Sequence, residues 1–423
     1  MLNQEVSQEY IKILKEELVP AMGCTEPIAL ACAAAKGRKE LGENPEKIIA
    51  KCSGNIIKNV KCVTIPNSGG LTGIESACLL GAIAGNPEAG MEVLENVTNE
   101  KKNQIRQLLD EKCCTVEFLD SEIPLHFIII LSTSSHQVEV EVRHTHTNIV
   151  SIKKDGVSVY ENQEKLQREG YTTDRTKLSL ENIKIFADEI ELEEIYSLYE
   201  KQIRCNMDIA YEGISGDYGL GIGRVIRESY ADGVVTRMKA FTAAASEARM
   251  GGCDMPVVIN SGSGNQGIAS SVPVIVYARE KNIPSEQLYR ALVFSSLLTI
   301  YQKEFIGKLS AFCGAVSASC ASAAAITYMV GGDMSQIKAT IDNTLANIPG
   351  IICDGAKISC AAKIATSVDA SMMAHHLAMQ NKEYEAFTGI LKENTGETIS
   401  CVGYIGKVGM HQTDKEIIKM MLE

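Results

Sequence analysis

The first 45 residues have the hydrophobic pattern of two helices joined by a turn. Large apolar side chains recur at helical spacing over residues 3–19, and small apolar side chains fill the alanine-rich run 28–36. Between them, the Pro- and Gly-rich segment 20–27 interrupts the pattern and predicts a turn that presents Cys24 at the start of the second helix. We expect residues 1–45 to pack on the C-terminal part of the chain.

Alternating and β-branched patterns dominate residues 46–178 and predict strands. Two helical segments, at 71–85 and about 88–109, interrupt them, and the turn at 154–156 favours a hairpin. We therefore expect an α/β domain with a mostly antiparallel sheet over residues 46–178. The predicted strand segments are 48–66, 114–119, 125–132, 137–145, 148–152 and 157–160.

Residues 179–423 have a helical pattern almost throughout, interrupted by glycine-rich loops. The preceding stretch, 161–179, is polar and poor in large apolar residues, so we expect an exposed connection and a domain boundary there. The predicted fold class is α+β, with a mostly helical domain that would carry the catalytic site and a smaller α/β domain that contains the antiparallel sheet.

Composition narrows the class of partner. The net charge of −12 and the lack of a basic stripe argue against nucleic acid, and a small metabolite is expected instead.

Residues 1–6 lack the pattern of a signal peptide, so the 14 cysteines are expected to be reduced in a cytoplasmic protein. The uncharged run 309–332 is mostly small residues and predicts a buried helix, not a membrane span. Small-residue helices of this kind favour a homodimer.

Three cysteines form a candidate metal or cluster site: Cys313, Cys353 and Cys360. Glycines beside them would let the backbone approach a metal, and three thiolates leave one coordination position free, as catalytic metal sites do. The alternative is that all three are buried apolar cysteines. Cys320, on the same predicted helix as Cys313, is the rival fourth ligand.

Cys24 is a candidate base or nucleophile. Its position at a predicted helix N-terminus is one that lowers a thiol pKa and favours the thiolate. Its neighbours Thr25 and Glu26 are candidate substrate contacts from the same turn. The alternative is a small side chain packed in a tight turn.

Two similar Gly-rich loops, 67–74 and 260–268, each precede a predicted helix. Backbone N–H groups and hydroxyls at a helix N-terminus stabilise an anion, so one or both loops would hold a substrate carboxylate. Lys357 would offset cluster charge or stand near that carboxylate, the alternative being a solvated surface lysine. The candidate residues of the loops are Asn67, Ser68, Gly69, Gly70, Ser261, Gly262, Ser263, Gly264 and Asn265.

Two histidines, His144 and His146, fall on a predicted strand where they would share a face. They could bind a metal, but a solvated strand face or a hydrogen-bonded core pair is the more common arrangement for such histidines. The sequence does not assign them a role.

Five motifs together resemble the iron-sulfur L-cysteine desulfidase family, also described as serine dehydratase alpha-chain-like. The resemblance extends over essentially the whole chain, and its motifs are segments 20–27, 67–70, 261–267, 312–315 and 353–357. It implies an oxygen-sensitive lyase with a 4Fe-4S cluster that converts L-cysteine and water into pyruvate, ammonia and hydrogen sulfide.

The resemblance implies that Cys313, Cys353 and Cys360 ligate the cluster and that Cys24 is the base. L-Serine is the alternative substrate, because the two cysteine segments also resemble iron-sulfur L-serine dehydratases. Those enzymes have a Ser-Ser-Ser-His-Thr segment, whereas the nearest stretch here, 132–136, is followed by Gln137. A non-enzymatic iron-sulfur or zinc protein, with Cys320 or Cys401 as fourth ligand, is the alternative from another class.

Overall fold

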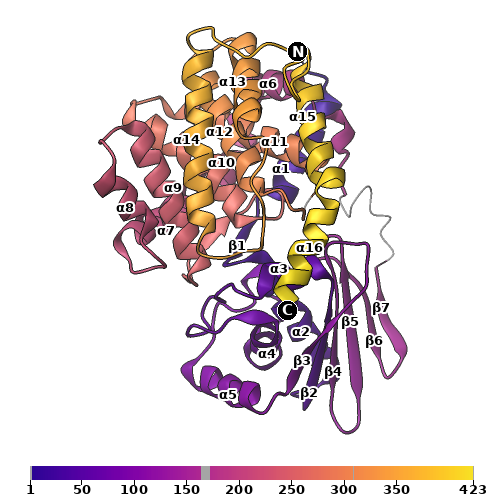
Figure 1. Ribbon diagram of the computed structural model, residues 1–423. Coiled ribbons are helices and arrows are strands. Elements are labelled where there is room, and N and C mark those ends of the chain that lie inside the picture. The colour runs from indigo at the N-terminus through magenta and orange to yellow at the C-terminus, as the bar shows by residue number, and fades with distance from the viewer. Residues whose placement is uncertain (1, 163–171, 308, 423) are drawn as a thin grey trace.

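The computed structural model describes residues 2–162, 172–307 and 309–422, and it has the predicted α+β fold. A large helical body occupies the upper part of Figure 1, and a sheet with a few helices lies below it. Within the described residues, no helix is long and apolar enough to cross a membrane.

The sheet contains six strands in the order β3-β2-β4-β5-β6-β7. All neighbours are antiparallel except β2 and β3, so the mostly antiparallel sheet is confirmed. Alternate residues of β4 and β5 are buried, as a half-covered sheet requires. The strands are β2 (Lys47–Cys52), β3 (Cys114–Phe118), β4 (His126–Ser132), β5 (Gln137–Arg143), β6 (Ile149–Lys154) and β7 (Val157–Glu161).

Two segments differ from the sequence prediction. The strand expected over 48–66 ends at Cys52, and α3 (Gly54–Val60) follows it. Residues 56–60 of this helix are all buried, which is not the alternation of a half-covered strand. The helix expected from 88 to 109 is instead a 3-10 turn, η1 (Gly90–Glu92), and a separate helix, α5 (Asn99–Asp110), whose start is capped by Thr98.

Helices α2 (Thr25–Leu41) and α4 (Gly73–Ala84) pack closely against each other. A Cβ atom on Gly81 would lie 2.0 Å from the carbonyl oxygen of Ala31, so the contact requires glycine at this position. The body of α2 also lies against β4 and β5, and its Gly37 packs on Leu131. The start of α2 is thereby fixed between the sheet and the helical body.

We expect Gly81→Ala to lower the free energy of unfolding by about 1–3 kcal/mol, because the added methyl group overpacks the contact with Ala31. Gly233→Ala is the matched control, since nothing lies within 4 Å of a Cβ atom there. Thermal and denaturant unfolding would measure both. Equal midpoints for the two variants would contradict the close α2–α4 packing.

The helical body is built around α9, α10, α12 and α14, which pack on one another. The buried helix expected within 309–332 is α12. The body comprises α6 (Leu180–Glu189), α7 (Tyr196–Ser215), α8 (Ile222–Ser229), α9 (Val234–Met250), α10 (Gly264–Glu280), α11 (Ser285–Ile306), α12 (Gly314–Met329), α13 (Met334–Asn347), α14 (Cys360–Ala378), α15 (Thr395–Tyr404), the π turn η5 (Ile405–Gly409) and α16 (His411–Leu422), with 3-10 turns η3 (Arg175–Lys177) and η4 (Leu192–Glu194).

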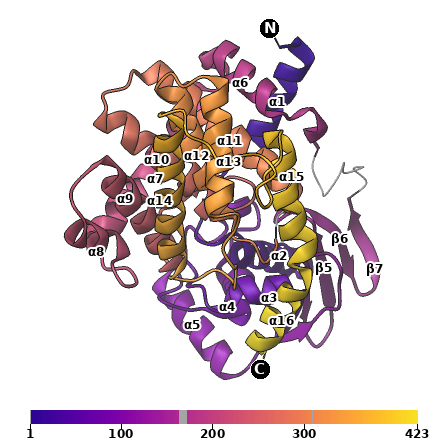
Figure 2. The same cartoon turned by 45° about the horizontal axis from the view of Figure 1, so that its top comes forward.

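The N-terminal helix packs on the helical body, and the C-terminal helix packs on α3. α1 (Gln4–Glu17) packs on α11, and β1 (Pro20–Met22) pairs antiparallel with β8 (Pro256–Val258), which places Cys24 beside the helical body. Figure 2 shows α15 and α16 in succession along one side, with α16 ending beside α3. There Lys58 and Asp414 form a buried ion pair with an N–O distance of 2.5 Å.

The connection expected at 161–179 falls partly outside the described residues, which omit 163–171. Its remaining part is tied to α1, since Thr172 and Thr173 bond to Glu16 and Arg175 pairs with Glu16 and Glu17. The division of the chain into residues 1–45, 46–178 and 179–423 stays a prediction.

Candidate active site

Four helices begin at one small pocket, which we call the cysteine pocket. The N-terminal residues of α2, α10, α12 and α14 line it, and its volume is about 90 Å³. Converging helix N-termini place partial positive charge and N–H groups around the pocket, so it favours anions. Its lining includes Cys24, Thr25, Glu26, Asn59, His146, Arg249, Ser261, Gly262, Ser263, Asn265, Gln266, Cys313, Cys353 and Cys360.

The three cysteines that are distant in sequence all reach this pocket. Cys313 precedes α12 and Cys360 begins α14. An isolated antiparallel bridge between Phe312 and Ile352 brings the Cys353 segment beside the Cys313 segment. In it the Cys313 N–H donates to the Ile351 carbonyl at 2.8 Å, and the Cys353 N–H donates to the Ala311 carbonyl at 2.7 Å. Burial raises the pKa of Cys313 to about 12, and the charges of Cys353 and Cys360 add to the rise.

The donor set suits an iron-sulfur cluster better than a single ion. In the described part of the chain, no group of three or more His, Cys, Asp or Glu side chains is arranged to hold a metal ion. Around a cluster each thiolate binds a different iron, so its ligands need not converge on one point, and the three thiols line one pocket. The surrounding helix N-termini would stabilise the negative charge of thiolate ligands.

The rival ligands lie elsewhere. Cys320 is fully buried within α12, where Thr344 hydrogen-bonds its thiol, and it does not line the pocket. Cys401, on α15, does not line it either. The three predicted cysteines thus line the pocket, whereas the two rival ligands do not.

Cys24 is the N-cap residue of α2 and is 3% exposed. It belongs to a small buried cluster that also contains Cys360 and Met250. The sequence-based expectation of a lowered thiol pKa is wrong for this structure: burial raises the pKa of Cys24 to about 12, and the Arg249 guanidinium opposes the rise. A thiolate at Cys24 therefore depends on positive charge nearby.

Thr25 and Glu26 line the pocket as predicted and are held by a short hydrogen-bond chain. The Thr25 hydroxyl lies 3.0 Å from both the Glu26 carboxylate and the Gly262 carbonyl, and the Asn59 amide donates to Glu26 at 2.9 Å. These hydrogen bonds join α2, α3 and the loop before α10. It keeps a carboxylate at a fixed place in the pocket.

Of the two Gly-rich loops, the second lines the pocket and the first does not. Ser261 and Gly262 have positive φ angles of 49° and 74°, which turn this loop into the pocket. In the first loop, the Asn67 amide donates to the Leu94 carbonyl at 3.0 Å and the Ser68 hydroxyl to the Ile65 carbonyl at 2.6 Å. Asn67, Ser68, Gly69 and Gly70 thus stabilise a local turn, and the expectation that they contact substrate is not supported.

Lys357 also lies outside the lining, because its ammonium group pairs with Asp354. The role expected of Lys357, offsetting thiolate charge, is better matched by Lys363. That lysine bonds to the Ile352 carbonyl at 2.8 Å and to Asp354, and its charge lowers the pKa of Cys313.

Sequence reasoning missed Arg249, which is 2% exposed and lines the pocket from the end of α9. Its Nη1 donates to Asn265 Oδ1 at 3.2 Å, and its Nε has no hydrogen-bond partner within the described residues. Gly264 lies directly against it, since a Cβ there would be 2.2 Å from Nε. No motif marks Arg249, which lies near the end of a helix that also contains Arg237 and Lys239.

The two histidines separate instead of sharing a strand face. β5 ends at Arg143, and His144 has a φ of 67°, so the chain turns there. His146 lines the cysteine pocket beside Gly262, whereas His144 lines a different cavity. His136, the histidine nearest to the serine dehydratase motif by sequence, is half-exposed and bonds to Asp155. Of the sequence-adjacent pair at 146–147, only His146 lines the pocket.

A buried pocket of thiols, one cation and hydrogen-bonding loops at the junction of a helical body and a sheet is typical of an enzyme that acts on a small molecule. Residues 88–419 match the family model described as "Serine dehydratase alpha chain". The chain belongs to this family of serine dehydratase-like lyases. The three pocket cysteines fall within the matched residues, and Cys24 precedes them.

Curated relatives resemble the chain over nearly its full length. A "UPF0597 protein" of Lachnoclostridium phytofermentans is 46% identical over 98% of this chain and 99% of its own. One of Treponema denticola is 44% identical over 100% of this chain and 99% of its own, and one of Finegoldia magna is 43% identical over 98% and 100%. These names state no activity.

Proposed function

We propose that the protein is an iron-sulfur-dependent L-cysteine desulfidase, which eliminates sulfide from L-cysteine to give pyruvate, ammonia and hydrogen sulfide. The single observation that carries this proposal is that Cys24 shares one buried pocket with Cys313, Cys353 and Cys360. A purely structural or redox cluster needs ligands, but it does not need a further thiol and an arginine beside them.

Cys313, Cys353 and Cys360 would hold a 4Fe-4S cluster. When bound, the cluster would supply a Lewis-acidic iron without a protein ligand, which makes the substrate thiol a better leaving group. The neighbouring helix N-termini and Lys363 would balance the charge of the thiolates.

Arg249 would bind the substrate carboxylate, because a guanidinium matches a carboxylate with two parallel hydrogen bonds and its Nε lacks a partner within the described residues. Asn265 positions the guanidinium by accepting from it. Glu26 would face the substrate ammonium group. With carboxylate and ammonium fixed, the Cα–H bond has one orientation in the pocket.

Cys24 would take the α-proton as general base. Its burial opposes ionisation, and the Arg249 guanidinium provides the opposite effect. Loss of the α-proton and of the β-sulfur forms a carbon-carbon double bond, and the resulting aminoacrylate tautomerises and hydrolyses in water to pyruvate and ammonia. The protein is not required for those last steps.

Arg249→Lys is expected to raise the KM for L-cysteine by about 10–100-fold, because a point charge replaces a bidentate donor. The cluster absorbance should stay unchanged. Arg279→Lys is the matched control, since Arg279 is bonded to the Tyr211 hydroxyl away from the pocket. A KM in Arg249→Lys equal to that of the control would refute the assignment of the carboxylate site.

L-Serine is the second candidate substrate, favoured by the family to which the chain belongs. The chemistry is the same with hydroxide as leaving group in place of sulfide. Comparing kcat/KM for L-cysteine and L-serine on the same anaerobic preparation distinguishes them. A kcat/KM that favours L-serine would replace desulfidase by dehydratase.

A further inference from the structure

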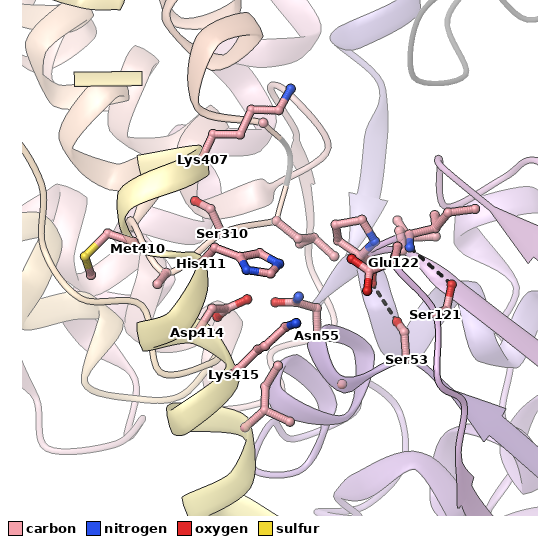
Figure 3. Close-up of a pocket in the computed structure, with 18 of the residues that line it drawn as sticks. Ser53, Asn55, Ser121, Glu122, Ser310, Lys407, Met410, His411, Asp414 and Lys415 are labelled. Atoms are coloured by element: carbon pink, nitrogen blue, oxygen red, sulfur yellow. Dashed lines mark hydrogen bonds between the residues drawn. The ribbon is translucent and has the colours of Figure 1, made fainter. Parts of the chain in front are cut away.

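A second cavity lies outside the cysteine pocket and has a volume of about 1020 Å³. We call it the large cavity. Its walls are α16, the segment 118–125 that follows β3, the start of α3, and residues around 309–311 (Figure 3). Leu309 and Ser310 line both this cavity and the cysteine pocket, so the two adjoin.

One wall of the large cavity carries basic side chains. His411, Lys415 and Lys419 are spaced four residues apart on α16 and all line the cavity, so they form a row along one helical face. In Figure 3, His411 and Lys415 extend from α16 toward the interior of the cavity. Asp414, on the same face, does not cancel them, because its charge is paired with Lys58.

The opposite wall is anionic. Asp120 and Glu122 line it from the segment after β3, and Figure 3 shows Glu122 across the cavity from α16. The rest of the lining is largely apolar, with Phe118, Ile123 and Ile418 among it. A cavity with cations on one wall, carboxylates on the other and apolar surface between them complements a zwitterion with an apolar middle.

We propose that the large cavity binds the zwitterion of an α-amino acid or of a short peptide. The carboxylate would face Lys415 and His411, and the ammonium group would face Glu122 and Asp120. Asn55, which extends from α3 into the space in front of α16 in Figure 3, has an Oδ1 atom with no hydrogen-bond partner in the described part of the chain and offers a further acceptor. The volume exceeds that of one amino acid and leaves room for two or three residues.

The cavity is joined to the cysteine pocket through α3. That helix contributes Asn55 to the cavity wall, Lys58 to the ion pair with α16, and Asn59 to the hydrogen bond with Glu26 in the cysteine pocket. Gly355, in the loop between Cys353 and Cys360, packs directly on the Lys58 carbonyl. A ligand that fixes α16 against α3 would therefore change the position of groups that line the cysteine pocket.

Binding is tested by calorimetry on the full-length cluster-loaded protein with ligands that lack a β leaving group: free L-leucine and L-methionine in one arm, and glycyl-leucine and leucyl-glycine in the other. Lys415→Glu and Glu122→Lys are each expected to weaken binding by at least about 10-fold. Lys382→Glu, an exposed lysine outside the cavity, is the charge-matched control and should bind as the wild type does. The ligand class with the lower dissociation constant shows whether the site prefers an amino acid or a peptide.

Absence of binding in both arms would overturn the proposal, as would binding that is equally strong in Lys415→Glu, Glu122→Lys and the control. Displacement of the ligand by L-cysteine with unchanged affinity in Lys415→Glu would assign it to the cysteine pocket and would also overturn the proposal. None of these results depends on turnover, so they are distinguishable from failure of the proposed desulfidase activity.

The link through α3 rests on the proposed function and has its own readout. The ligand found by calorimetry should shift the KM for L-cysteine in the wild type and in Lys382→Glu, but not in Lys415→Glu. If saturating ligand left the KM of the wild type unchanged, the link through α3 would be refuted. The binding site itself would not be affected by that result.

Discussion

Cys24→Ala is expected to lower kcat for sulfide release from L-cysteine by about 10²–10⁴-fold, the usual contribution of a general base. The reason is the position of the thiol: it begins α2, points into the cysteine pocket and lies in one buried cluster with Cys360. Iron content and visible absorbance should equal those of the wild type, because Cys24 is not among the proposed ligands. Initial rates of sulfide release on anaerobic protein measure the effect.

The matched control is Cys32→Ala on the same helix. Cys32 is also buried, but it does not line the pocket, so its replacement removes the same atoms from α2 without touching the site. Its kcat should equal that of the wild type. If Cys24→Ala and Cys32→Ala were equally active, Cys24 would be a packing residue and another group would have to take the α-proton.

Cys353→Ser is expected to lose bound iron and visible absorbance together, and with them all activity. The loop that carries Cys353 is held against the segment before α12 by backbone hydrogen bonds, so a serine there would occupy the same place and lack the thiolate. Cys313→Ser and Cys360→Ser should behave alike. Iron analysis and absorbance spectra of the reconstituted proteins measure this effect without any assay of turnover.

Cys320→Ala tests the specificity of that result, because Cys320 is on the same helix that Cys313 precedes but is packed in the core. It should keep full iron content. Loss of iron in Cys320→Ala with retention in Cys353→Ser would contradict the proposed ligand set and would favour a different cluster geometry.

The sequence predicted the parts of the fold that depend on local pattern. Alternation along β4 and β5 and helical spacing in α1 and α12 are local signals, and each element formed close to its predicted place. Segment 53–66 could not be assigned this way. Its β-branched residues are typical of strands, yet residues 54–60 form a helix and residues 61–66 lie outside any named helix or strand.

Prediction of the candidate site from local sequence pattern has the same limit. Cys24, Ser261, Gly262, Ser263 and Asn265 line the pocket, and they could be proposed from sequence because turns with Gly and Ser before a helix have a local signature. The 67–70 loop has that signature too, but its side chains bond to neighbouring backbone, which only the folded chain reveals. Arg249 and Asn59 lie in helices without a motif, and their roles depend on which helices meet.

The raised pKa of Cys24 illustrates the competition between two effects. A helix N-terminus lowers a thiol pKa, whereas complete burial raises it, and the balance depends on solvent exclusion that a sequence does not specify. Arg249 is the compensating charge that the structure supplies. The base and the carboxylate-binding residue proposed for the reaction thus depend on each other.

The most direct test of the central proposal is the product balance of anaerobically reconstituted protein incubated with L-cysteine. Sulfide, pyruvate and ammonia are measured together with the cluster absorbance. The proposal predicts that the three products appear in equal amounts for as long as the cluster absorbance persists. An intact cluster that yields neither sulfide nor pyruvate would contradict it.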